Sequence, residues 1–217
     1  MIEIRKTTTY GWDAAIRGMR NPLNSWGKSD SRFYGKYRNP LGIGENDLDL
    51  MKRLIAGGTE HRKFLRMITV TVDITAPLYW WKEFDTYKVG TVANSCSTMH
   101  KIHAKEFTIN DFSYEHLTNW YHDGELCRDW LDTLECLIDD LNVARELYVE
   151  TKDKKYWWQM IQLLPSSYNQ KRTVQLNYEV LLTQYRQRKY HRLDEWLHFC
   201  DWICTLPYMK EFLEVTQ

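Results

Sequence analysis

The stretch between residues 86 and 97 carries the side chains best suited to contact a ligand. A phenol and an ammonium group stand side by side at Tyr87 and Lys88, and the polar groups of Thr91, Asn94 and Ser97 follow. Lysine supplies a cation, while hydroxyl and amide groups can donate and accept hydrogen bonds. Polar loops held by rigid elements are common places for ligand contacts. The spacing therefore indicates a binding loop.

Three further side chains have two open interpretations. His61 follows the Gly57-Gly58 pair and is either an ordinary exposed or capping residue or faces a ligand. Arg188 is either a ligand-binding cation or one more positive charge at a helix end, where the helix dipole favours cations. Cys96 could be a nucleophile, but no histidine stands at a spacing that predicts activation of its thiol.

The remaining reactive groups favour structural roles. The pair His100-x-x-His103 could ligate a metal if it were helical, but no further carboxylate or cysteine is arranged around it. We therefore expect surface histidines and no metal site. Cys200 and Cys204 are one turn apart on an apolar stripe, which favours core positions.

A strand and a helix must position the binding loop. Apolar residues alternate with Thr and Asp from Ile68 to Thr75, a period of two that predicts a half-buried strand. Ala76-Pro77 ends that strand, since proline gives no N–H to a ladder. An aromatic helix is expected from Leu78 to about Lys88, and a polar loop from Gly90 to Met99.

The rest of the chain predicts a mainly helical frame around this unit. A strand is expected at Ile2 to Ile4, and a long turn-rich loop from Asn21 to Gly44. Residues 104–123 are expected to form a linker without regular structure. Helices are expected at Trp12 to Arg20, Asn46 to Ala56, Gly124 to Glu150, Lys155 to Leu163, Thr173 to Arg188 and His191 to Thr205.

Bulk properties fit one globular α+β domain over residues 1–217. Lys+Arg and Asp+Glu are both 29, so the formal charge is zero and the electrostatic footprint of a duplex-binding protein is missing. No apolar run is long enough to span a bilayer, and the N-terminus lacks the apolar core of a signal peptide. Five cysteines, an odd number, indicate reduced thiols. We expect a cytoplasmic protein without membrane contact.

Two blocks of the sequence resemble the flavin-dependent thymidylate synthases (the ThyX family). Their signature is Arg-His-Arg-x-x-Ser followed by Asn, Ser and Arg. The matching positions here are Thr86-Tyr87-Lys88-x-x-Thr91, then Asn94, Ser97 and Met99 or His100. The second block is Leu164-Pro165, then Asn177 in QLNYEVLL, then Arg188.

The resemblance implies a small antiparallel sheet packed with several helices, in a homotetramer whose active sites lie between subunits. It implies an enzyme that uses FAD, reduced by NADPH, to move the one-carbon unit of methylenetetrahydrofolate onto C5 of deoxyuridine monophosphate (dUMP). The cofactor-binding positions would be His61, Tyr87, Lys88, Thr91, Asn94 and Asn177. The substrate-binding positions would be Lys82, Glu83, Ser97 and Arg188, of which Arg188 and Ser97 would be catalytic.

The chain departs from the family where phosphates would bind. Thr86 and Lys88 replace signature arginines, Tyr87 replaces the histidine, and Glu83 replaces a glutamine. Lysine binds phosphate as a point charge and lacks the planar fork of arginine. Three hypotheses follow: a ThyX-like flavoenzyme, a ThyX-fold enzyme with altered nucleotide substrate or chemistry, and a non-catalytic helical interaction protein. Replacement cations could come from Arg17 to Arg20, Lys28 to Arg38 or Arg62-Lys63.

Overall fold

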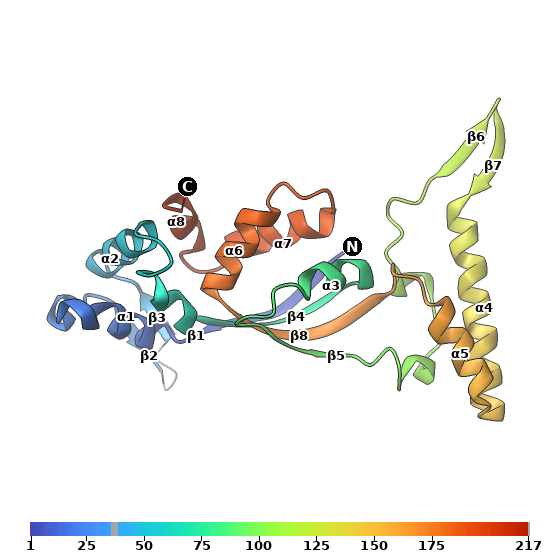
Figure 1. The fold of residues 1–217 in the computed structure, drawn as a ribbon, viewed down its shortest axis with the longest axis horizontal. Helices are drawn as coiled ribbons and strands as arrows, with labels where there is room; N and C mark the ends of the chain where they lie inside the picture. The colour runs from blue at the N-terminus through green and yellow to red at the C-terminus, as the bar shows by residue number, and fades with distance from the viewer. Residues whose placement is uncertain (36–38, 217) are drawn as a thin grey trace. The chain divides into compact units, whose positions relative to one another are not determined.

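A computed structural model describes residues 1–35 and 39–216 of the chain (Figure 1). Its main sheet has four strands in the order β1-β4-β8-β5, each antiparallel to its neighbours. These strands are β1 (Glu3–Tyr10), β4 (Thr69–Pro77), β8 (Asn169–Asn177) and β5 (Val92–Ser95). Helices make up much of the remaining chain, so the expected α+β class with a small antiparallel sheet is confirmed.

The chain divides into two compact units. The central unit consists of Met1–Glu3, Thr75–Phe84 and Asn94–Arg172. The terminal unit consists of Ile4–Ile74, Asp85–Ala93 and Thr173–Gln217. A single domain over residues 1–217 stays a prediction, and residues 36–38 and 217 lie outside the described part. Among the described residues, no helix combines the length and apolar character needed to cross a membrane.

Strand β4 has the alternation that the sequence predicts. Ile68 precedes it, and Val70, Val72 and Ile74 are at most 1% exposed, while the Thr and Asp positions between them are half-buried. The strand ends at Pro77, and α3 (Leu78–Phe84) begins directly after it. This helix ends four residues before the expected boundary at Lys88. The expected polar loop from Gly90 to Met99 is also wrong in part, because β5 occupies its middle.

The terminal unit contains five helices among its described residues. Trp12 of α1 packs edge-on against Tyr178 of α6, with ring centroids 5.2 Å apart. Trp196 and Ile203 of α7 are fully buried, which confirms the apolar stripe expected there. The elements are α1 (Trp12–Arg20), β2 (Arg32–Tyr34), β3 (Asn39–Gly42), α2 (Glu45–Ala56), α6 (Tyr178–Arg188), α7 (Asp194–Thr205) and α8 (Met209–Glu214).

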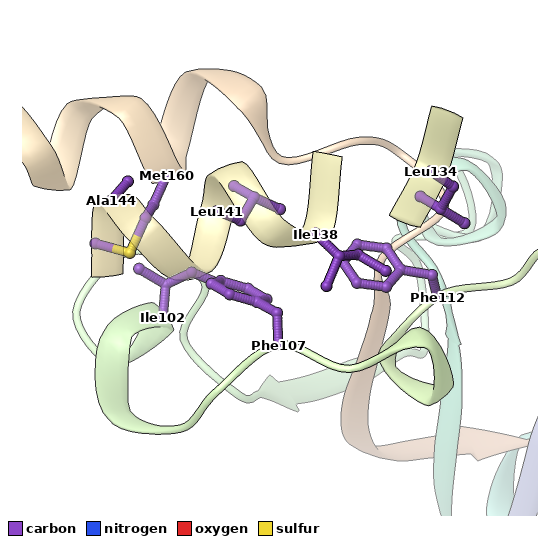
Figure 2. Close-up of a cluster of buried hydrophobic side chains, with 8 residues drawn as sticks. All are labelled: Ile102, Phe107, Phe112, Leu134, Ile138, Leu141, Ala144 and Met160. Atoms are coloured by element: carbon purple, nitrogen blue, oxygen red, sulfur yellow. The ribbon is translucent and has the colours of Figure 1, made fainter. Parts of the chain in front are cut away.

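The central unit has its own hydrophobic cluster between two helices and the segment before them. Its helices are α4 (Trp130–Thr151) and α5 (Lys154–Leu163). Asp129 caps α4 by accepting hydrogen bonds from the backbone N–H groups of the first turn. Figure 2 shows the side chains of the cluster, which are Ile102, Phe107, Phe112, Leu134, Ile138, Leu141, Ala144 and Met160.

Further sequence-based expectations about boundaries are wrong. The start of the helix expected at Gly124 instead belongs to a hairpin, in which β7 (Glu125–Asp129) pairs with β6 (Asn119–His122) from the expected linker. Asp123 and Gly124 form its turn with positive φ angles of 50° and 82°. The start of the helix expected at Thr173 belongs to β8, because Val174 and Leu176 are buried on alternate positions of a strand.

Candidate functional site

The predicted binding loop and the start of α6 enclose a cavity of about 310 Å³ in the terminal unit. The loop forms one wall with Tyr87, Lys88 and Val89. The helix forms the other wall with Glu179, Val180 and Thr183, and Thr86 completes the lining. The structure thus brings parts of both sequence blocks to one place.

The loop packs closely on the helix because of a glycine and a cap. Gly90 has a φ of +76°, and a Cβ atom there would lie 2.7 Å from Nδ2 of Asn177. Any other residue at position 90 would therefore clash with Asn177 and strain the backbone. Asn177 is also the N-cap of α6, and its Oδ1 accepts a hydrogen bond of 3.0 Å from the N–H of Val180. This cap fixes where α6 begins.

Tyr87 and Arg188 meet at the other end of α6. Nε of Arg188 donates a hydrogen bond of 3.0 Å to the hydroxyl oxygen of Tyr87, which donates one of 2.8 Å to Oε1 of Gln187. The guanidinium lies 4.8 Å from the ring centroid of Trp196, within the range of a cation–π interaction. Tyr87 and Arg188 are both half-buried. These contacts hold a guanidinium and a phenol together at a partly open surface.

Charge around the cavity is nearly balanced. Lys88 is the single cation among the described residues that line it. Glu179 is neutralised by Arg62, whose guanidinium makes contacts of 2.9–3.1 Å to both carboxylate oxygens. Close to the glycine, Oγ1 of Thr91 is shielded from solvent and has no hydrogen-bond partner among the described residues. Buried polar atoms are nearly always paired, so this hydroxyl is a candidate for a ligand contact.

The other predicted site residues are not among those that line this cavity. Lys82, Glu83, Asn94 and Ser97 belong to the central unit. Oγ of Ser97 accepts hydrogen bonds from the backbone N–H groups of Met99 (3.2 Å) and His100 (2.9 Å), which stabilises a local turn.

His61 is exposed and lines a separate cavity of about 360 Å³ together with Phe64 and Met67. His61 thus does not join Tyr87 and Lys88 at their cavity. Its role as a cofactor contact stays a prediction.

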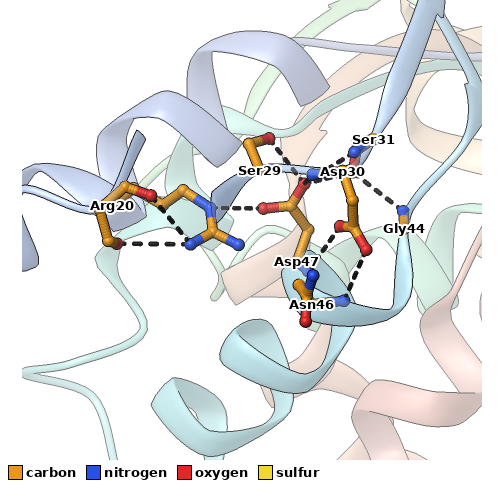
Figure 3. A network of polar contacts seen from close by, with 8 residues as sticks. Arg20, Ser29, Asp30, Ser31, Gly44, Asn46 and Asp47 are labelled. Carbon is orange, nitrogen blue, oxygen red and sulfur yellow. Dashed lines mark hydrogen bonds and ion pairs between the residues drawn. The ribbon is translucent and has the colours of Figure 1, made fainter. Parts of the chain in front are cut away.

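Arg20 and Arg62, from two of the basic segments that could replace the missing cations, form ion pairs within the fold. Arg20 is 3% exposed, and its Nε lies 2.6 Å from Oδ1 of the fully buried Asp47 (Figure 3). Ser29, Asp30 and Ser31 donate to the other oxygen of that carboxylate. Arg62 is paired with Glu179, as described above. Lys36 and Arg38 of the third segment lie outside the described residues.

Hydrogen bonds keep the buried carboxylate of Asp47 ionised. Burial alone raises the pKa of Asp47, but the hydrogen bonds from Ser31, Ser29 and Arg20 outweigh burial and hold the pKa below its ordinary value. Asp47 is therefore a stable partner for Arg20.

The cysteines and histidines add no reactive centre. Burial raises the pKa of Cys200 to about 12, so its thiol stays protonated, as expected of a core cysteine. Cys96 is exposed and Cys204 is half-buried. Across residues 1–35 and 39–216, no group of three or more His, Cys, Asp or Glu side chains is placed to hold a metal.

Several contributors to the site were not predicted from the sequence. Among them, Glu179 lines the cavity, Gln187 accepts a hydrogen bond from Tyr87, and Trp196 lies against Arg188. Glu179 could have been noticed as an acidic residue in the first turn after the N-cap. Trp196 is fully buried in α7, and its ring lies against the guanidinium of Arg188.

Comparison with solved structures shows that the chain has the fold of the ThyX thymidylate synthases. The chain is similar to the ThyX thymidylate synthase of Helicobacter pylori, solved with FAD and dUMP, at 16% identity and a TM-score of 0.68, with all of both chains covered. A second structure of that enzyme, solved with FAD and dUMP, is 15% identical in sequence to this chain at a TM-score of 0.65. The match covers all of this chain and 99% of the other.

A methylase with a related structure has the same fold. The UMP/dUMP methylase PolB of Streptomyces cacaoi, bound with 5-Br dUMP, is 14% identical at a TM-score of 0.60, covering all of this chain and 93% of the other. No protein-family model and no curated protein matches the sequence. At these identities the likeness shows the fold over the whole chain.

Proposed function

We propose that this protein binds a pyrimidine nucleotide at the Tyr87–Arg188 site and transfers a one-carbon unit to C5 of its ring. The contact between Tyr87 and Arg188 carries this proposal, because it joins the two blocks that resemble ThyX across 101 positions of the sequence. The three similar structures are of enzymes named for this substrate class, two solved with dUMP and one with 5-Br dUMP.

The chemistry of this pair suits a pyrimidine. A pyrimidine ring carries carbonyl oxygens, and C5 becomes a better nucleophile when negative charge on these oxygens is stabilised. A guanidinium that is held in place before the reaction provides such stabilisation without having to reorganise. Arg188 is held by the Tyr87 hydroxyl and by the Trp196 ring. In this proposal Arg188 binds the ring, and Tyr87 positions Arg188.

The described residues do not fit the FAD that the resemblance implies. Val89, Val180 and the Tyr87 ring offer a wall for a flat ring. The two phosphates of FAD would need several cations or free N–H groups. Lys88 is the single cation among the described residues lining the cavity, and the carboxylate of Glu179 lies in the opposite wall. The role proposed for Arg188 and Tyr87 therefore does not depend on FAD.

The finer details remain proposals. FAD, NADPH and methylenetetrahydrofolate as cofactor and co-substrates, a homotetramer, and a cytoplasmic location all come from the resemblance or from composition. The alternative of an altered nucleotide substrate is favoured by the likeness to a UMP/dUMP methylase. That enzyme is named for a ribonucleotide, UMP, as well as for dUMP. The alternative of a non-catalytic interaction protein is favoured by the missing phosphate ligands.

One assay separates these three functions. The purified chain is incubated with methylenetetrahydrofolate, NADPH and FAD, and with either dUMP or uridine monophosphate (UMP), and the nucleotides are analysed by mass spectrometry. Methylation of dUMP supports the ThyX-like reaction, and methylation of UMP alone supports the altered substrate. If neither nucleotide is methylated and neither binds in a calorimetric titration, the enzyme proposal is wrong and the interaction protein is favoured.

A further inference from the structure

A second cavity, of about 310 Å³, lies entirely within the central unit. Lys152 lines it from the short connection between α4 and α5, and Lys154 and Trp157 line it from the first turn of α5. His100 and His103 line it from the segment that follows β5. None of these residues has a part in the proposed function.

Two contacts fix the segment with the histidines against the helices. Nε1 of Trp157 donates a hydrogen bond of 2.9 Å to the carbonyl oxygen of Met99. Ile102 packs beside Ala144 and Met160 in the hydrophobic cluster, as Figure 2 shows. The cavity is therefore built on the core of the unit.

The lining is cationic. Two lysines and two histidines contribute to it, and no Asp or Glu does so among the described residues. The carboxylate nearest in sequence, Asp153, caps α5 through the N–H of Lys155 at 2.9 Å and pairs with the Lys155 ammonium at 3.2 Å. An anion in this cavity would therefore meet positive charge without a facing carboxylate.

One buried polar atom in this wall also has no partner. Nδ1 of His103 is shielded from solvent and makes no hydrogen bond to any described residue. The imidazole packs edge-on against Tyr148, with ring centroids 4.9 Å apart, so its orientation is held. A fixed imidazole nitrogen without a partner is a group that a ligand could satisfy.

We propose that this cavity binds a nucleoside monophosphate, with the phosphate among the lysines and histidines and the base against Trp157. Trp157 is half-buried and presents an aromatic surface in the same wall as the cations. Lys154 already lies 5.9 Å from the centroid of that ring. The volume is at the low end of small-molecule sites, which suits one nucleotide better than a dinucleotide.

Histidine resonances provide a local readout in the full chain. UMP, inorganic phosphate and uridine are titrated separately while the imidazole NMR signals of His100 and His103, assigned with His100→Gln and His103→Gln, are followed. We expect saturable shifts with UMP, weaker binding of phosphate, and no shift with uridine. Lys154→Ala should weaken UMP binding about tenfold, the effect of losing one charge-assisted contact.

Matched variants show whether the site is specific. Lys155→Ala removes the same charge one residue away, outside the cavity lining, and should leave the affinity unchanged. Arg188→Ala should also leave the histidine shifts unchanged, which separates this site from the proposed active site. The absence of saturable shifts with UMP, or equal weakening by Lys154→Ala and Lys155→Ala, would overturn the proposal. Equal affinity for phosphate and UMP would contradict the assignment of a nucleotide.

Discussion

Arg20 and Arg188 are each the last residue of a helix, yet their surroundings differ. Arg20 is 3% exposed and meets the carboxylate of Asp47, which is itself fully buried and accepts hydrogen bonds from three neighbouring residues (Figure 3). Arg188 is half-buried and contacts a phenol and an indole ring.

The difference separates an arginine buried in an ion pair from one held at a half-buried position by a hydroxyl and an aromatic ring. A buried ion pair with saturated hydrogen bonds cannot be opened without leaving an unpaired charge in the core. Arg188 instead donates a hydrogen bond to the hydroxyl of Tyr87 and lies over the ring of Trp196, and these contacts hold its guanidinium in place at a half-buried position. Burial and partner type, rather than sequence position, thus distinguish the two.

The largest expected effect is on the buried pair. Asp47→Asn should lower the free energy of unfolding by about 3–5 kcal/mol, because Arg20 would remain buried without a counter-charge. Urea denaturation followed by circular dichroism measures this. Asp49→Asn, on the same helix, removes the exposed partner of Arg53 and should cost at most about 0.5 kcal/mol. Equal losses in the two variants would show that Asp47 is no more important than a surface carboxylate.

A smaller effect of the same carboxylate concerns acid stability. Because the pKa of Asp47 is below its ordinary value in the folded chain, the unfolded chain binds the proton more readily. The stabilisation is present above the ordinary pKa and is lost as the pH falls through the folded pKa. As the pH falls from the ordinary pKa of an aspartate toward the lower folded pKa of Asp47, the urea denaturation midpoint of the wild type should therefore decrease more steeply than that of Asp47→Asn. Parallel curves would exclude Asp47 as a source of acid sensitivity.

The smallest effect is expected at the partly open site. Tyr87→Phe removes the hydroxyl that joins Arg188 and Gln187, and should cost about 0.5–1.5 kcal/mol of unfolding free energy, as for a typical hydrogen bond. Thermal or chemical denaturation measures it, with Tyr190→Phe, which changes a largely exposed tyrosine, as the control. A loss near that of Asp47→Asn would mean that the Tyr87 contact has a structural role like that of the buried pair.

The sequence predicted the elements whose periodicity is regular. The alternation of β4 follows directly from apolar residues at every second position, and α4 lies almost entirely within the helix expected from Gly124 to Glu150. Strand β8 was missed because Lys171 and Arg172 interrupt its alternation, although Arg172 packs over the ring of Trp81 at 4.2 Å. The β6–β7 hairpin could have been found from Asp123-Gly124, a pair typical of tight turns between strands.

The candidate site was predicted only in part. The resemblance selected Tyr87 and Arg188, and the structure brings these two together. Contacts such as Gly90 against Asn177 depend on tertiary packing between distant segments, which local patterns do not encode. The use of Arg20 and Arg62 in ion pairs also could not be deduced, since their partners are 27 and 117 positions away.

A nucleotide titration of Arg188→Ala tests the central claim most directly. dUMP and UMP are titrated calorimetrically into the wild type, into Arg188→Ala, and into Arg186→Ala, which removes an exposed arginine from the same end of α6. We predict binding of at least one nucleotide by the wild type, with affinity about tenfold or more weaker in Arg188→Ala and unchanged in Arg186→Ala. Wild-type affinity in Arg188→Ala would contradict a pyrimidine site at Tyr87 and Arg188.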